Sequence, residues 1–302
     1  MFLVNISRAP LNNAALRPSS EHYPPRKFIL FEQYPVKPEK AVERLRELNS
    51  KNPDYKLDRC EFCMCIAAFN NNPITSRDDL YNALVKSIVW WPETDVLPAV
   101  DLLCRAVLDF NMNRLIFGSP GDVPELLFIR LKALLLSKGD PKVKFIVIRG
   151  FCNAFSHAYG QHVMIAHVAD LMNDLMHVYG QSSDSESIQI AIASFIHNSA
   201  RATTAMYATE DRRTERSAII RILLSSLNDI VDFDFSFKMS AEAVRYFQIA
   251  IITLMWGDKD LVTVAANAGV LTLTEHFSDV FANKDIKEFS GEIRNMVCSV
   301  LQ

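Results

Sequence analysis

Glycine is scarce in this chain, at 9 of 302 residues, which is about half of its usual share of roughly 7%. Loops that cradle phosphate groups are rich in glycine, and sheets with many tight turns need it at positive φ. The shortage therefore argues against a nucleotide-binding loop and against a fold made of many short strands.

Long apolar runs are missing as well. No stretch approaches the roughly 18 to 20 residues that cross a bilayer, and the first residues hold only the short cluster Phe2–Val4, without the apolar core of a signal peptide. The six cysteines are too sparse for a disulfide framework. We therefore expect a protein of the cytoplasm or nucleus that does not insert into membranes.

Charge of one sign is not in excess, because 32 Lys and Arg stand against 35 Asp and Glu. A global field that would attract nucleic acid or an anionic membrane is thus absent, and any attraction to an acidic partner must be local.

Catalytic motifs are not found either. The sequence has no Gly-x-Ser-x-Gly, no Gly-x-x-x-x-Gly-Lys and no His-Glu-x-x-His, and Ser156 beside His157 is mere adjacency. Cys60, Cys63 and Cys65 lack the further ligands of a zinc site, so we interpret them as small buried thiols of a helix. We expect no enzyme activity, no cofactor and no metal.

A repeat of polar side chains is what the chain does contain. Arg149, Asn153 and Ser156 stand at i, i+4 and i+7 in one apolar segment, and Ser194, Asn198 and Arg201 occupy the same places 45 residues later. These spacings share one helix face. Equivalent helices at a fixed period are typical of a helical solenoid, in which such stripes align into a groove that binds polypeptide.

Hydrophobic periodicity and helix-boundary residues predict an almost entirely helical body. The expected helices are Pro38–Asn49, Leu57–Asn70, Arg77–Trp90, Val96–Phe110, Pro124–Lys138, Lys142–His157, Gln161–Tyr179, Ser187–Ala205, Thr214–Val231, Ala241–Gly257, Lys259–Ala268 and Lys284–Leu301. Together they form an all-α, armadillo-like domain over residues 26–302.

The remaining segments are expected outside helices. Residues 1–25 carry four prolines and no periodicity, and we interpret them as a linker or disordered tail that can be removed without loss of folding. Phe28–Phe31 is predicted to be an extended segment laid over the first helices. Met206–Arg216 is a charged connection, and Asp232–Lys238 is a loop pinned by its phenylalanines.

Several strings resemble the PUL domain, which lies at the C-terminus of phospholipase-activating protein and its fungal Ufd/Doa relatives. The resemblance runs from about Lys27 to Leu301, and IRGFCNAF at Ile148–Phe155 is its most specific part. The other strings are FEQYPVKPEKAVERLRELN, DVLPAVDLL, YGQHVM, IQIAIASFIHNS and AANAGV.

The resemblance implies an armadillo-like array whose basic groove binds the acidic C-terminal tail of the hexameric AAA ATPase valosin-containing protein, which connects it to ubiquitin handling. In that family an arginine directly follows Asp-x-Leu in the fourth-helix string, whereas here Cys104 takes this place and Arg105 follows. On the last groove helix the arginine position aligns with Tyr246, and Arg245 precedes it. A shift by one residue turns a side chain by about 100°, so it stays open whether Arg105 and Arg245 reach the groove.

Arg149 and Asn153 are the strongest candidates for peptide contact, because a guanidinium binds a carboxylate while an amide one turn away binds a peptide backbone. The alternative is that Asn153 links neighbouring helices and Arg149 is only solvated. Since the stripe faces away from the apolar side, we expect replacement of Arg149 to leave folding almost unaffected. Asp101 and Asp109 are expected to pair with Arg105 within its helix.

Asn198 and Arg201 have the same two interpretations, with Arg201 pairing with nearby acids as the alternative. His197 beside them is interpreted as a hydrogen-bonded residue at the groove edge. The sequence thus predicts a peptide-binding adaptor, and the alternative is a helical-repeat scaffold or oligomerisation module with another partner.

Overall fold

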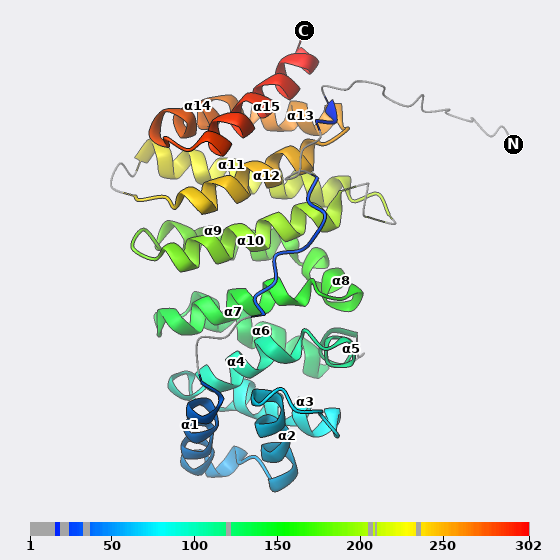
Figure 1. The fold of residues 1–302 in the computed structure, drawn as a ribbon, viewed down its shortest axis with the longest axis vertical. Coiled ribbons are helices and arrows are strands. Elements are labelled where there is room, and N and C mark those ends of the chain that lie inside the picture. The colour runs from blue at the N-terminus through cyan, green and yellow to red at the C-terminus, as the bar shows by residue number, and fades with distance from the viewer. Residues whose placement is uncertain are drawn as a thin grey trace, which may run out of the picture.

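The structure is a computed structural model and describes residues 16–18, 24–32, 37–118, 122–204, 208, 210–233 and 237–301. These residues form fifteen α-helices and no strand (Figure 1), which confirms the all-α prediction. The helices are α1 Pro38–Lys51, α2 Arg59–Phe69, α3 Arg77–Val85, α4 Leu97–Ala106, α5 Phe110–Gly118, α6 Asp122–Leu136, α7 Pro141–Ala154, α8 Ala158–Ala166, α9 Val168–Gly180, α10 Glu186–Thr203, α11 Arg213–Phe233, α12 Ala241–Met255, α13 Lys259–Asn267, α14 Val270–Val280 and α15 Lys284–Leu301. None of these helices is long and apolar enough to cross a membrane.

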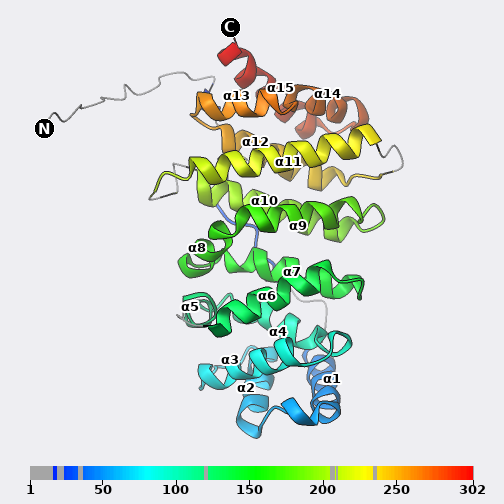
Figure 2. The ribbon, with the colours of Figure 1, turned by 180° about the vertical axis from the view of Figure 1, so that it is seen from behind.

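Two stacks of helices make up the solenoid. One stack runs α4, α7, α10, α12 and α15, each packed on the next, and faces the viewer in Figure 1. The other stack includes α6, α9 and α11 and faces the viewer in Figure 2. Apolar side chains between the stacks form one continuous core, with Phe151, Phe195 and Phe247 fully buried. Neighbouring helices thus cover most of each other's apolar surface, as in other repeat proteins.

Three helix boundaries differ from the sequence prediction. The expected helix Val96–Phe110 ends early, as α4, and Asp109 accepts hydrogen bonds from the backbone N–H groups of Asn111 and Met112, so its side chain caps an additional helix, α5, that was not expected. The expected helix Gln161–Tyr179 breaks at His167, whose ring stacks on Phe128 with centroids 4.8 Å apart. Gly269 has φ +83°, which ends α13 and permits the additional helix α14.

The cysteines of α2 are placed differently from the sequence interpretation. Cys65 is buried with Glu61 and Phe69, at spacings of four residues along one face. Cys60 and Cys63 lie off this stripe and are exposed, so the prediction of buried thiols is wrong for both. The described residues contain no group of His, Cys, Asp or Glu that could hold a metal ion.

Part of the segment before residue 26 is packed against the last repeats. Leu16 is buried, its carbonyl accepts a hydrogen bond from Gly257 N–H at 2.6 Å, and the Pro18 carbonyl accepts one from the Trp256 indole at 3.2 Å. The guanidinium of Arg17 lies 5.3 Å from the Trp256 ring. Residues 1–15 and 19–23 lie outside the described part, so the interpretation of residues 1–25 as a removable tail stays a prediction.

Residues 26–32, here called the strap, cross the exposed face of the solenoid in an extended conformation (Figure 1). The strap lies over α10 and then α7, so its prediction over the first helices was wrong. It runs opposite to the order of the repeats, because Ile29 contacts α10 and Phe31 contacts the earlier α7. The partners that decide this position are Asn198 and Asn153, which the sequence brings to the same face of successive helices.

We expect Asn153→Ala to lower the free energy of unfolding by about 2–4 kcal/mol, because it leaves the polar backbone groups of Phe31 and the buried carbonyl of Cys104 without their partner. Chemical denaturation of the full chain measures this change. Asn70→Ala, at the exposed end of α2, is the matched control and should stay within about 0.5 kcal/mol of the parent. Equal stability of the two variants would contradict the structural role of Asn153.

Candidate functional site

Two asparagines hold the strap by its backbone. Asn198 Oδ1 accepts the N–H of Ile29 at 2.8 Å, and its Nδ2 donates to the Ile29 carbonyl at 2.9 Å. Asn153 makes the same pair of bonds with Phe31, at 2.7 and 3.1 Å. Alternate residues of an extended chain are about 6.6 Å apart, comparable to the 8–10 Å spacing of packed helices. The asparagine pair is therefore a backbone-binding ladder, and in this structure the chain's own strap occupies it.

Arginines flank the strap and contact its aromatic rings. The Arg201 guanidinium lies 3.9 Å from the ring centroid of Phe28 and donates to the carbonyl of Arg26 at 3.0 Å. Arg149 lies 5.1 Å from the ring of Phe31. Both distances are typical of cation–π contacts. The polar stripe of α7 and α10 is thus covered by the strap along the described segment.

Burial corrects the expectation that Arg149 can be replaced without an effect on folding. Only 3% of Arg149 is exposed, and its guanidinium also lies 5.4 Å from the ring of Phe145 on its own helix. Removing a side chain packed in this way loses apolar contact as well as charge. The binding role of Arg149 therefore cannot be tested by truncation to alanine alone.

The two serines of the repeated stripe serve the helices. Ser156 donates to the Val107 carbonyl of the preceding repeat at 3.0 Å, and Ser194 donates to Ile190 within α10 at 2.8 Å. Asn153 has a comparable second role, since its Nδ2 also donates to the Cys104 carbonyl at 2.8 Å. The Asn153 side chain thus binds an extended backbone and links neighbouring helices at the same time.

Arg105 is held inside the repeat rather than along the strap. It pairs with Asp101 at 3.5 Å, donates to the Phe69 carbonyl at 3.4 Å, and stacks over the Phe69 ring at 5.5 Å. Asp109 was expected to share Arg105, but it caps α5 and pairs with Arg77 at 3.4 Å instead. Burial raises the pKa of Asp101, opposed by the charges of Arg105 and Arg149.

Arg245 and Tyr246 likewise have partners on neighbouring turns and helices. Arg245 forms an ion pair with Asp285 of α15 at 2.7 Å. The Tyr246 hydroxyl donates to Glu242 at 3.1 Å, and burial together with the charge of Glu242 raises the Tyr246 pKa. The Tyr246 ring lies 5.8 Å from the ring of His197, at the end of the groove beyond the strap's two asparagines.

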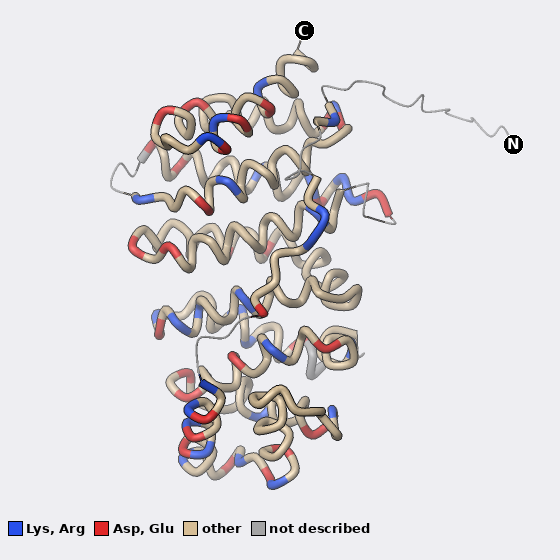
Figure 3. The backbone as a smooth tube through the Cα atoms, viewed as in Figure 1, with Lys and Arg blue, Asp and Glu red and all other residues tan. Residues whose placement is uncertain are grey.

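A cavity of about 430 Å³ opens next to the strap, between α1, α4 and α7. Its apolar lining comes from all three helices, and its rim carries four basic side chains and one acid among the described residues. The lining residues are Lys40, Ala41, Arg44, Leu97, Pro98, Asp101, Lys142, Phe145, Ile146 and Arg149. Figure 3 shows basic positions on both α1 and α7, the helices that carry this rim. The cavity suits a peptide that offers an apolar side chain flanked by carboxylates.

A match to a protein-family model shows which family the chain belongs to. The family model named "PUL domain" matches residues 23–292 of the chain. The chain belongs to the PUL domain family. The resemblance seen in the sequence is confirmed, and the region that matches includes the strap, both asparagines and every described residue that lines the cavity.

Curated relatives of this PUL domain are distant and longer. The chain is 23% identical over 267 residues to the ubiquitin fusion degradation protein 3 homolog of Caenorhabditis elegans, covering 87% of the chain and 30% of that protein. It is 22% identical over 295 residues to the phospholipase A-2-activating protein of Xenopus laevis, covering 96% of the chain and 34% of the relative. The chain thus spans about a third of the length of these relatives.

A solved structure agrees with the armadillo-like prediction. A designed armadillo repeat protein superposes with a TM-score of 0.52 at 14% identity, covering 87% of this chain and all of that protein. At this identity the likeness establishes the fold and carries no argument about ligands.

Sequence reasoning missed several residues of the PUL domain's cavity. Lys142, Phe145 and Arg149 stand at i, i+3 and i+7, so the polar stripe of α7 could have been extended by two turns toward its beginning. Lys40 and Arg44 are one turn apart on α1, in a helix where no site residue was predicted from the sequence. Their position beside α7 follows from the packing of α1 on α4, which no local pattern indicates.

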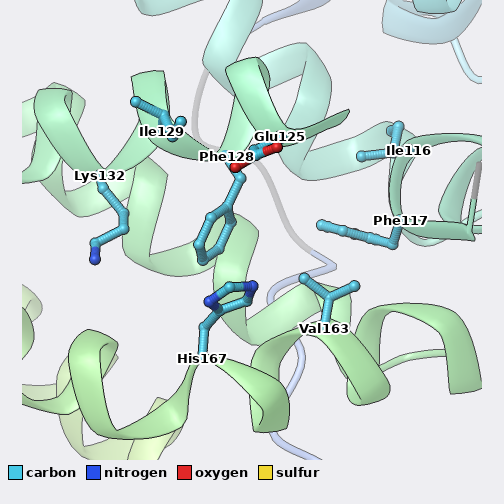
Figure 4. Close-up of a pocket in the computed structure, with 8 residues that line it drawn as sticks. All are labelled: Ile116, Phe117, Glu125, Phe128, Ile129, Lys132, Val163 and His167. Atoms are coloured by element: carbon cyan, nitrogen blue, oxygen red, sulfur yellow. The ribbon is translucent and has the colours of Figure 1, made fainter. Parts of the chain in front are cut away.

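A second cavity, of about 410 Å³, lies between α5, α6, α8 and the residue that joins α8 to α9, His167 (Figure 4). Two of its polar lining residues contact neighbours: Lys132 pairs with Asp174 at 3.2 Å, and the His167 ring packs on Phe128. The rest of its described lining is Ile116, Phe117, Glu125, Ile129 and Val163. It lacks the basic rim of the first cavity, so we place the candidate peptide site at the first cavity.

His197 is buried beside the ladder, with its Nδ1 3.4 Å from Asn198 Oδ1. Burial lowers its pKa from 6.5 to about 4, and the positive charge of Arg201 adds to this, whereas the contact with Asn198 opposes it. The imidazole is therefore neutral in the folded protein at neutral pH. This agrees with its interpretation as a hydrogen-bonded residue of the groove edge.

Because the folded-state pKa of His197 lies below the unfolded value, its contribution to stability is complete above about pH 6.5 and is lost as the pH falls toward 4. We expect protonation of His197 to lower the free energy of unfolding by about 2 kcal/mol when the pH is lowered from 7.5 to 5. Urea denaturation of the parent and of His197→Gln across this range measures the difference. The variant should show the shallower pH dependence, and identical slopes would contradict a neutral buried imidazole.

Proposed function

We propose that this PUL domain is a non-catalytic adaptor that binds the acidic, tyrosine-containing C-terminal tail of the AAA ATPase valosin-containing protein. The observation that carries the proposal is the cavity beside the strap, where Lys40, Arg44, Lys142 and Arg149 surround an apolar floor. Because the net charge of the whole chain is −3, an acidic ligand is attracted only where basic side chains gather locally, as they do at this cavity.

The chemistry of the cavity fits both parts of such a tail. Carboxylates of the tail form charge-assisted contacts with the basic rim, and an arginine can bind one by two parallel hydrogen bonds. The aromatic side chain enters between Leu97, Pro98 and Phe145, which form part of the apolar lining. The tail needs no contact with the asparagine ladder, which the strap already fills.

Binding without chemistry is supported by the side chains that could have formed a catalytic pair. Ser156 donates to the Val107 carbonyl, and His157 contacts the Leu108 carbonyl at 2.8 Å. Both side chains thus link α7 and the turn after it to the preceding repeat. The name of the Caenorhabditis elegans relative, a ubiquitin fusion degradation protein 3 homolog, supports a role in ubiquitin-dependent protein handling, in the cytoplasm or nucleus.

The alternative of a scaffold or oligomerisation module has one observation in its favour. Leu126, Ile129 and Leu136 of α6 are each at least 42% exposed and share one helix face. Their surface belongs to the stack opposite the strap (Figure 2). A scaffold that uses this face would not need the basic cavity, so mutations of the cavity distinguish the two functions.

We expect the double variant Lys40→Glu, Lys142→Glu to lose at least tenfold in affinity for the tail peptide, measured by isothermal titration calorimetry. Both side chains are exposed, so the fold should be retained, and the loss should shrink at high salt because the interaction is electrostatic. Arg221→Glu with Lys259→Glu, on exposed positions of α11 and α13, makes the same change in net charge and should bind like the parent.

Two outcomes would count against this function. Absence of binding by the parent chain at millimolar peptide would favour the scaffold. Equal affinity of the two double variants would place the peptide somewhere other than the cavity.

A further inference from the structure

The guanidinium of Arg149 lies between two aromatic rings that come from different parts of the chain. Phe145 belongs to the same helix, α7, and its ring centroid is 5.4 Å from the guanidinium carbon; Phe31 belongs to the strap, and its ring is 5.1 Å away. Arg149 and Phe145 both line the basic cavity. The strap therefore contributes one of the aromatic rings that pack on a cavity arginine.

The position of the Phe31 ring is set by α7 itself. Asn153, one helical turn after Arg149, binds both polar backbone groups of Phe31, at 2.7 and 3.1 Å. Asn153 thus fixes the backbone of Phe31, and the ring of Phe31 packs on Arg149. This is a stronger constraint than the side chain of an isolated surface arginine experiences, since a long side chain otherwise has several accessible rotamers.

The strap lies beside the cavity and does not fill it. The described lining residues of the cavity come from α1, α4 and α7, and neither strap residues nor the ladder asparagines are among them. A strap that competed with the ligand would have to cover the lining. The strap instead contacts the cavity at Arg149, on which its Phe31 ring packs.

We propose that Phe31 is a positioning residue for acidic-peptide binding, because its ring holds the Arg149 guanidinium against Phe145 at the edge of the cavity. The proposal rests on the function proposed above and adds a role for the strap. The asparagine ladder thereby acts on ligand binding indirectly, by seating the strap.

The expected effect is a loss of affinity when the ring face is removed. Phe31→Leu keeps an apolar side chain of similar reach but removes the cation–π contact, and we expect it to weaken binding of the acidic tail peptide about three- to tenfold. Phe31→Tyr retains the ring face and should restore affinity to within about twofold of the parent. A strap that competes with the ligand predicts the opposite sign, namely tighter binding by Phe31→Leu.

Phe28 supplies a matched control within the same strap. Its ring packs over Arg201 at 3.9 Å and stacks on Phe155 at 5.6 Å, and neither contact involves a described residue of the cavity lining. Phe28→Leu should therefore cost stability comparable to that of Phe31→Leu and leave the affinity for the peptide unchanged. Comparison of the two variants separates loss of strap packing from loss of arginine positioning.

A double-mutant cycle with Arg149→Lys tests the mechanism directly. Lysine keeps the charge but lacks the planar group that stacks between two rings, so Phe31→Leu should change affinity less than twofold in the Arg149→Lys background. The titrations use the full 302-residue chain and a labelled acidic, tyrosine-containing tail peptide at two salt concentrations, with thermal denaturation of each variant alongside.

The outcomes keep the two proposals apart. If the parent does not bind the peptide, the proposed function fails, whatever Phe31 does. If the parent binds and Phe31→Leu binds equally well or more tightly, or if Phe28→Leu loses as much affinity, the positioning role of Phe31 is overturned and the function stands. Selective loss in Phe31→Leu that disappears in the Arg149→Lys background supports it.

Discussion

The position of the strap depends on the hydrogen bonds that two asparagine side chains make with its extended backbone. An amide group offers one acceptor and one donor at a fixed separation, so it pairs with both polar groups of a single residue. Asn198 and Asn153 do this for Ile29 and Phe31. Because the bonds go to the backbone, they require an extended chain but no particular side chain. The strap meets this requirement as a segment of the same molecule, whose local concentration is high without any need for strong binding.

Filling the ladder from within changes what the rest of the groove can do. The repeat would otherwise present an unoccupied surface for extended peptides along α7 and α10. With the strap in place, backbone recognition is already used there, and the accessible binding chemistry is at the neighbouring cavity between α1, α4 and α7. In the proposed function the side chains of this cavity, and not the ladder, contact the ligand. Its four basic residues and its apolar floor fit a ligand with carboxylates next to a large apolar side chain.

Several arginines of the solenoid have a structural role. Arg105 is paired with Asp101 of its own helix, and Arg245 is paired with Asp285 of the packed neighbour α15. Arg216 is almost fully buried and donates to the carbonyls of Leu254 and Trp256. Burial of such groups is tolerated because hydrogen bonds and opposite charges compensate the lost hydration. The cavity differs in that several cations share one space with a single described acid.

The sequence by itself determined the fold class, the ladder and the family. Helical periodicity gave most helix positions, and the i, i+4, i+7 spacing placed each amide on the polar face of its own helix, because these properties depend on residues close together in the chain. The repeat after 45 residues then indicated that the two helices are equivalent. Only the tertiary structure decided that the strap binds these amides, that Lys40 and Arg44 lie beside α7, and that Phe31 covers Arg149. Those arrangements bring together residues far apart in the chain, such as Phe31 and Asn153, which are 122 positions apart. They follow from how the helices stack, which a local pattern does not specify.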